Sequence, residues 1–490
     1  MKLTQAVLRS FITLFFLAVA VAYGIAWFAP SIGLYHEDAV NLVTAKALLA
    51  GHGYTLDSQP VPVPRTDQPP FFPLLLAVFA AVSQQPAWLK LLPLLATAAW
   101  LTVTWQLLRK MGADAWGAIL ITGITAASPA VIFLSTNLVP ESLFALFIAA
   151  ALLALLSDRM ILAGILAGLA TLTCAAGFPL IAGCAITLVV RGRFRRAVAF
   201  TLPAILLAAP WFGWSLAHAT AQTPASILTT LPASEKATVF ATNLLFLFSG
   251  PFSLLSGIED MYAALFTVIL LGWCLWKRRQ LLPDIFLFLY CLVLVCFAEP
   301  PQRWLAPVLP LILWLFWRVF RNFPRREAIA AVILILAILP LGASLRRLPA
   351  TLRAGEFPPT AKGTDDWNQM GKLFGWLRAN SAPDAILAAN LDPLFYLQTG
   401  RKTVRGFAPN GYKTHYQASG LAVTPDQLSS SLLQNGVNYL ILTPDPDFAE
   451  SSAYRRSAEA LERGGFLEPV EIPGLSRQYR VLKTGQARFR

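Results

Sequence analysis

Long blocks of apolar residues, separated by short polar stretches, fill the first two thirds of the chain. Blocks such as residues 11–28 and 328–345 approach the roughly 17–25 apolar residues that a helix needs to cross a bilayer. Of the 490 residues, 56% are hydrophobic and 13% are charged, about half the charged fraction of a soluble protein. The pattern therefore predicts an α-helical polytopic membrane protein.

The first apolar block has two interpretations. Its basic start at Lys2 and Arg9, with small residues around 18–22, is compatible with a cleaved signal peptide. The length of the apolar run and the many later blocks favour an uncleaved first span instead. We expect this span at about residues 9–29.

Cysteines and charges exclude other classes of protein. All five cysteines lie in apolar blocks and none forms a CxxC pair, so neither a disulfide framework nor a cysteine metal site is predicted. The net charge of +13 could indicate nucleic acid, but Lys and Arg concentrate in short runs between apolar blocks. Such runs are typical of cytoplasmic loops. We therefore expect membrane lipids as partners, and no nucleic acid.

The basic runs orient the spans. Placing residues 109–110, 191–196, 277–279 and 318–326 in the cytoplasm predicts about eleven crossings, with a range of about nine to thirteen. The predicted spans are about 9–29, 87–108, 115–135, 141–157, 160–175, 177–190, 195–217, 262–276, 283–297, 304–320 and 327–345.

Two apolar stretches do not fit this alternation. Residues 69–84 form a short segment between proline pairs and polar residues, which we interpret as re-entrant or interfacial. Residues 30–86 then make a first periplasmic loop that contains this segment. Residues 239–256 are predicted to form a non-crossing hairpin.

The last 140 residues or so differ in composition. Residues 350–490 show a helix pattern at about 365–380 and apolar strands at 385–389 and 439–443. We predict a small α/β domain outside the cytoplasm, following a membrane domain over residues 1–349. No GxGxxG or P-loop spacing occurs, so a docking or lid role is expected rather than a nucleotide site.

Charged residues near hydrocarbon are costly, so those retained at span ends are candidates for function. Three groups stand out: residues 35–38 after the first span, Pro140-Glu141, and residues 299–304. The predicted topology places all three on the outer face. Carboxylates there can act as general bases, and an arginine can hold a phosphate. Together they suit group transfer from a phosphate-linked lipid donor.

Each of these residues also has a structural interpretation. Asp38 could be a solvated helix cap, and Glu141, after a proline, fits a first-turn carboxylate on a helix dipole. Arg303 could extend its side chain to lipid headgroups. His36 is a candidate only because it adjoins the two carboxylates.

Four stretches in chain order carry a resemblance. They are the acidic run with a glycine turn at Glu37–Tyr54, the Pro-Pro element at Gln68–Pro73, the Gly-Leu-Ala-x-Leu-Thr type span at Gly164–Gly177, and the Arg-aromatic-x-x-Pro span at Arg303–Pro310. The chain resembles the GT-C superfamily of polyprenyl-phosphate-sugar-dependent glycosyltransferases. The likeness is greatest to the family of protein O-mannosyltransferases and lipid A aminoarabinose transferases.

The resemblance implies a GT-C membrane fold, a periplasmic C-terminal domain and a catalytic carboxylate in the first loop. The family often has Asp-Glu where this chain has Glu37-Asp38, so both are candidates for the base, with Asp38 favoured. Gln68 replaces a common lysine and Cys174 a common arginine, which removes two phosphate contacts. Arg65 could substitute for one of them.

Our hypothesis is inverting sugar transfer from a polyprenyl-phosphate donor to an envelope lipid, glycan or protein, on the periplasmic face of the bacterial inner membrane. The expected substrate-binding residues are Glu141, Arg303, Arg65, His36 and Tyr54. No cofactor is firmly implied. A divalent metal is left open, although the first loop has no Asp-x-Asp pair.

Two other classes of function compete with this one. A transporter or flippase for a lipid-linked or anionic substrate would place polar residues near the midplane and often show internal repeats. Here the carboxylates lie at one predicted face, and the two halves show no repeat. A non-catalytic assembly partner that binds another envelope protein through its outer domain is the third class.

Overall fold

The computed structural model describes residues 2–29, 31–33, 35–218, 232–256, 280–297, 302–320, 367–405, 424–444 and 450–485. The described residues fall into two compact units. The first draws on residues 1–28, 66–75 and 87–348. The second draws on residues 29–65, 76–86 and 349–490.

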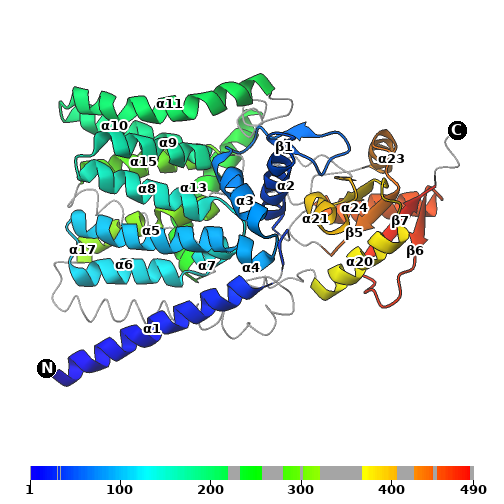
Figure 1. Ribbon diagram of the computed structural model, residues 1–490, viewed down its shortest axis with the longest axis horizontal. Coiled ribbons are helices and arrows are strands. Elements are labelled where there is room, and N and C mark those ends of the chain that lie inside the picture. The colour runs from blue at the N-terminus through cyan, green and yellow to red at the C-terminus, as the bar shows by residue number, and fades with distance from the viewer. Residues whose placement is uncertain are drawn as a thin grey trace. The chain divides into compact units, whose positions relative to one another are not determined.

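The regular elements described in the first unit are all helices, and Figure 1 shows them in blue to green. Its elements are α1 (Lys2–Phe28), α4 (Pro86–Leu89), α5 (Leu91–Lys110), α6 (Ala115–Ala127), α7 (Pro129–Thr136), α8 (Glu141–Leu156), α9 (Met160–Thr173), η1 (Ala175–Gly177), α10 (Phe178–Val190), α11 (Phe194–His218), α13 (Ala233–Ser256), α15 (Leu281–Val295), α16 (Gln302–Leu305), η2 (Ala306–Val308) and α17 (Leu309–Phe320).

Helices α5, α8, α9 and α11 run side by side in that order (Figure 1). Small residues allow this close packing. A Cβ added at Gly164 of α9 would lie 2.1 Å from the Phe200 carbonyl oxygen of α11, and one at Gly168 would lie 3.0 Å from the Ala204 oxygen. Glycine is therefore required at Gly164, because the backbones of α9 and α11 approach closely there.

The predicted span at 115–135 is broken into α6 and α7, which meet at an angle of 63°. Ser128 ends α6 and caps α7, accepting a hydrogen bond from the Val131 amide, and Pro129 is the first residue of α7. Proline lacks an amide hydrogen and favours a helix start. The Ser128 hydroxyl also donates to the Leu254 carbonyl in α13, which fixes the break.

Helix lengths bear on the predicted span count. Within the described residues, Pro86–Lys110 and Phe194–His218 are long and apolar enough to cross a membrane, and the bent pair of α6 and α7 counted together makes a third. Others are shorter: α8 has 16 residues, about 24 Å at 1.5 Å per residue, against a hydrocarbon core of about 30 Å. The predicted spans at 262–276 and 327–345 lie outside the described residues. The total of about eleven stays a prediction.

The stretch at 239–256 was predicted to be a hairpin, and this prediction is wrong. The structure has one 24-residue helix, α13, with Pro251 inside it. The hairpin was inferred from charge alternation, and the turn-type sequence Ser249-Gly250-Pro251 lies within the helix instead. A proline inside a helix removes one backbone hydrogen bond and crowds the preceding turn, yet α13 continues through Pro251 to Ser256. By contrast, Phe71–Val82 forms helix α3 of only 12 residues, as a non-crossing segment requires.

The second unit combines the first loop with a mixed sheet. Its elements are α2 (Glu37–Leu49), β1 (Thr55–Leu56), β2 (Val63–Pro64), α20 (Trp367–Asn380), β3 (Leu387–Ala389), α21 (Asp392–Thr399), β4 (Thr403–Val404), α23 (Pro425–Gln434), β5 (Tyr439–Leu442), α24 (Glu450–Arg463), β6 (Leu467–Val470) and β7 (Arg480–Thr484). The predicted helix at 365–380 and the strands at 385–389 and 439–443 correspond to α20, β3 and β5.

In the described part of the chain, five strands form this sheet in the order β4-β3-β5-β7-β6. Strand β3 is parallel to both β4 and β5, pairing Leu387 with Thr403 and with Tyr439. Strands β5 and β7, and β6 and β7, are antiparallel. Helices connect the parallel strands, because a parallel connection needs a crossover.

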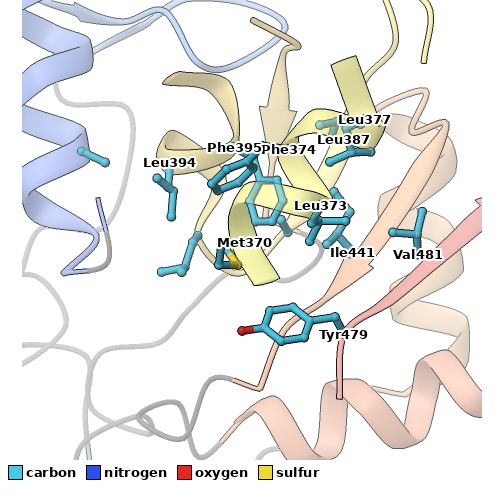
Figure 2. Packing of buried hydrophobic residues seen from close by; sticks show 13 residues of the cluster. Met370, Leu373, Phe374, Leu377, Leu387, Leu394, Phe395, Ile441, Tyr479 and Val481 are labelled. Atoms are coloured by element: carbon cyan, nitrogen blue, oxygen red, sulfur yellow. The ribbon is translucent and has the colours of Figure 1, made fainter. Parts of the chain in front are cut away.

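Side chains alternate between the two faces of the sheet. Ile441 faces a core with α20 and α21, shown in Figure 2 with Phe374, Leu394 and Val481. Leu440 faces a second core built with α23 and α24. Alternate strand residues point to opposite faces of the sheet, and helices cover each face. The described elements therefore make a helix–sheet–helix arrangement.

The first loop belongs to this core. Ala39 of α2 is fully buried in the same cluster as Leu394 and Phe374, and a Cβ at Gly33 would lie 2.7 Å from Leu394 Cδ1. The Thr403 amide of edge strand β4 donates to the Ser58 carbonyl at 2.8 Å, which covers an otherwise open sheet edge. Independent folding of residues 350–490 as a domain stays a prediction.

Candidate active site

Asp38 lies in the first turn of α2 and is 1% exposed. Its Oδ2 accepts a hydrogen bond from the Gly33 amide at 2.6 Å, and its Oδ1 accepts one from the Ala39 amide at 2.9 Å. Gly33 has φ +105°, a conformation that favours glycine. The local backbone therefore fixes the direction of this carboxylate, and the positive end of the helix dipole favours its ionised form.

Glu37 precedes Asp38 but has a different environment. Successive helix residues do not face the same way, and Glu37 is half-buried whereas Asp38 is buried. The two candidate carboxylates are thus distinguished by burial. Two backbone amides orient the Asp38 carboxylate.

Arg65 and Tyr54 lie against the next turns of α2. Arg65 is 1% exposed, and its Nη1 donates to Asn41 Oδ1 at 2.8 Å and to Thr44 Oγ1 at 3.3 Å. Its guanidinium carbon is 6.0 Å from the centroid of the Tyr54 ring. Asn41 follows Asp38 by three residues, so both lie on the same side of α2. Arg65 therefore braces the helix face that carries Asp38, while its role toward a phosphate stays a prediction.

His36 is the N-cap residue of α2, with an unusual positive φ of 56°. Arg405 Nη2 donates to its Nε2, so the imidazole proton belongs on Nδ1. Enclosure of the ring and the positive charges of Arg405 and Arg65 lower the pKa of His36 well below its usual value. His36 is therefore neutral at physiological pH.

Asp392 completes a buried cluster with Arg405 and Gln59. Arg405 Nε donates to Asp392 Oδ1 at 3.0 Å, and Gln59 Nε2 donates to Oδ2 at 3.2 Å. Burial raises the pKa of Asp392 to about 6, and the charge and hydrogen bond of Arg405 oppose that rise. The carboxyl group is thus mainly ionised at neutral pH and ready to protonate in mild acid.

Asp392 and Arg405 were not predicted from the sequence. Each follows a parallel strand, Asp392 after β3 and Arg405 after β4, and carboxyl ends of neighbouring parallel strands share one edge of a sheet. Strands of three and two residues are too short for a hydropathy pattern to identify. The available signal was an acidic and a basic residue placed directly after short apolar runs.

The remaining predicted residues lie in the helical unit, where they pair with each other. Glu141 begins α8 after Pro140 and is 1% exposed. Arg303 forms an ion pair with it and keeps 20% of its side chain exposed. The Arg303 guanidinium lies 4.9 Å from the centroid of the Trp304 ring, a cation–π distance. Glu299, which belongs to the same predicted group of residues 299–304, lies outside the described residues.

Glu141 and Arg303 therefore form one group, whereas Glu37, Asp38, His36, Tyr54 and Arg65 belong to the other compact unit. Across all the described residues, no three His, Cys, Asp or Glu side chains gather as a metal ion would require.

Comparisons with known proteins identify the fold. Neither a family model nor a curated protein sequence matches the chain. Its structure matches that of ArnT from Cupriavidus metallidurans bound to undecaprenyl phosphate, with a TM-score of 0.59, 13% identity, and coverage of 96% of this chain and 98% of ArnT. The apo form of ArnT gives a TM-score of 0.58 at 13% identity, covering 97% and 98%.

The archaeal oligosaccharyltransferase AglB from Archaeoglobus fulgidus, in complex with an inhibitory peptide and a dolichol-phosphate, is also similar. Its TM-score is 0.55 at 13% identity, covering 96% of this chain and 74% of AglB. These neighbours are GT-C glycosyltransferases, so the fold resemblance predicted from the four motifs is confirmed.

Proposed function

We propose that the protein is an inverting glycosyltransferase that moves a sugar from a polyprenyl-phosphate-linked donor to an envelope lipid, glycan or protein. The reaction would take place on the periplasmic face of the bacterial inner membrane. The GT-C fold supports this proposal, and ArnT and AglB are bound to undecaprenyl phosphate and a dolichol-phosphate, respectively. The observation that carries the proposal is Asp38, a buried first-loop carboxylate aimed by two backbone amides.

Asp38 acts as the general base in the proposed reaction. Each carboxylate oxygen has two lone pairs, and the Gly33 and Ala39 amides engage one on each oxygen. In the proposed reaction the Asp38 carboxylate takes the proton of the acceptor hydroxyl or amine. The freed electron pair bonds to the anomeric carbon as the bond from that carbon to the phosphate oxygen breaks. The products are the inverted glycoside and polyprenyl phosphate.

Arg303 stabilises the phosphate leaving group in this proposal. Buried Glu141 and the Trp304 ring contact its guanidinium, and 20% of the Arg303 side chain is exposed. A preorganised cation directed at developing charge can contribute several kcal/mol to a transition state. Glu141 is then a positioning residue, and Arg65 is a second candidate for the phosphate.

Purified protein in sealed proteoliposomes tests the donor class. Sugars labelled with carbon-14 are supplied on polyprenyl phosphate, on polyprenyl diphosphate or on a nucleotide, with an extract of envelope lipids, glycans and proteins as the acceptor source. We expect transfer from polyprenyl phosphate alone, with one polyprenyl phosphate released per sugar and an inverted anomeric configuration by NMR.

Two results would contradict the proposal. One is transfer from the nucleotide donor. The other is passage of label across the bilayer with the sugar still attached to its lipid, which would identify a flippase. Heat-denatured protein in the same liposomes provides the background for both.

A further inference from the structure

The guanidinium of Arg405 connects two segments that are far apart in the chain. Its Nε binds Asp392, at the start of α21, and its Nη2 binds His36, at the start of α2. Gln59, from the same first loop as His36, binds the second oxygen of Asp392. Both the first loop and the sheet thus contribute to one buried polar cluster.

The topology explains why the cluster forms here. The carboxyl ends of β3 and β4 meet at one edge of the sheet, which places Asp392 beside Arg405. The first loop lies along the outer side of edge strand β4, where the Thr403 amide donates to the Ser58 carbonyl and Lys402 Nζ donates to the Asp57 carbonyl at 2.5 Å. The cluster therefore joins the first loop to the strands of the sheet.

Arg405 is suited to hold the His36 ring neutral and in one orientation. Its planar fork can contact two groups at fixed directions, and Asp392 compensates its charge. Because His36 accepts a hydrogen bond at Nε2, it stays neutral and adds no positive charge beside Glu37 and Asp38. His36 also has a sparsely populated backbone conformation, and such residues persist where their surroundings hold them.

We propose that Arg405 and Asp392 are positioning residues for sugar transfer. They hold His36, and His36 directly precedes the turn of α2 that carries Asp38, so the sheet edge sets the position of the carboxylate. This inference rests on the proposed function and extends the site to two residues more than 350 positions away in sequence. It assigns the C-terminal sheet a part in the chemistry beyond docking.

Kinetics of the full-length protein test the proposal. Arg405→Gln is expected to lower kcat about tenfold to a hundredfold, since small misplacements of a reacting group cost that much, and to leave the KM for the donor within about twofold. Arg405→Lys keeps the charge but cannot contact both Asp392 and His36, so its kcat should be close to that of Arg405→Gln. Combining Arg405→Gln with His36→Ala should be no worse than the more damaging single variant, because the two act in series.

Arg480→Gln is the matched control. Arg480 lies in β7 of the same sheet and pairs with Glu462 of α24 at 2.6 Å, and neither residue is part of the cluster described above. It should keep kcat close to that of wild type. An unchanged kcat in Arg405→Gln, or losses that simply add in the double variant, would overturn the proposal.

Hydrogen exchange separates this inference from the proposed function. The amides of residues 38–44 should exchange at least about tenfold faster in Arg405→Gln than in wild type, because α2 opens locally when its anchor is lost, and should be unaffected in Arg480→Gln. If wild type transfers no sugar from any donor, the proposed function fails while faster exchange still supports the anchor. Unchanged exchange overturns the anchor whatever the activity.

Discussion

Asp392 has a carboxyl group whose protonation should be visible in stability. Burial raises its pKa from 3.8 to about 6, so the folded state takes up a proton more readily than the unfolded state. The stability that this group contributes is then fully present below about pH 4 and is lost as pH rises through 6. The change amounts to about 3 kcal/mol, from roughly 1.4 kcal/mol per pKa unit.

The measurement compares wild type with Asp392→Asn in one detergent between pH 4 and 7.5. We expect the wild-type unfolding temperature, relative to the variant, to be highest at pH 4 and to fall as pH increases. Groups elsewhere titrate in both proteins and cancel in the difference. A difference independent of pH would show that the pKa of Asp392 is not raised in the folded protein.

Individual candidate residues were predictable to different degrees. Glu37, Asp38, Glu141 and Arg303 were identified because charge is costly beside apolar spans, and the pairing of Glu141 with Arg303 gives each a partner. Asp392 had no such signal. It follows the short apolar run at residues 385–389 in a water-soluble region, where a single carboxylate is common, and only the sheet topology shows that it is buried.

Among the elements, α9 and α11 depend on glycine for their contact. Gly164→Ala is expected to destabilise the protein by about 1–3 kcal/mol, a typical cost of overpacking, because its Cβ would overlap the Phe200 carbonyl. Gly24→Ala in α1 is the control, since nothing lies within 4 Å of its added Cβ, and alanine favours a helix by up to about 1 kcal/mol. Thermal unfolding of both variants measures the effect, and equal stability would contradict this packing.

Elements were predicted well where a local pattern was strong. The helix and strands assigned near 365–380, 385–389 and 439–443 are present, and the short apolar segment before residue 84 is the short helix α3. The hairpin at 239–256 was wrong because it was inferred from loop charges rather than from turn residues. The break at Ser128-Pro129 has a recognisable local signal, a helix-cap residue followed by proline. It was missed because the apolar residues around it were read as one continuous span at 115–135.

At the scale of the whole molecule, the order of four motifs predicted the GT-C fold that the match to ArnT confirms. The packing of the first loop against the C-terminal sheet was not predictable in the same way. Hydropathy and charge report whether a segment faces water or lipid, but they do not say which loop meets which sheet edge. That contact decides where Asp38 lies, and it depends on long-range packing around Ala39 and Leu394.

The most direct test of the account is sugar transfer by purified Asp38→Asn protein with a polyprenyl-phosphate donor. Loss of a general base should lower kcat by about a hundredfold or more, while folding is retained because the side chain is nearly isosteric. Glu37→Gln, at the half-buried neighbour, should retain more activity, and Asp384→Asn, at an exposed carboxylate, should match wild type. Wild-type activity in Asp38→Asn would contradict the account.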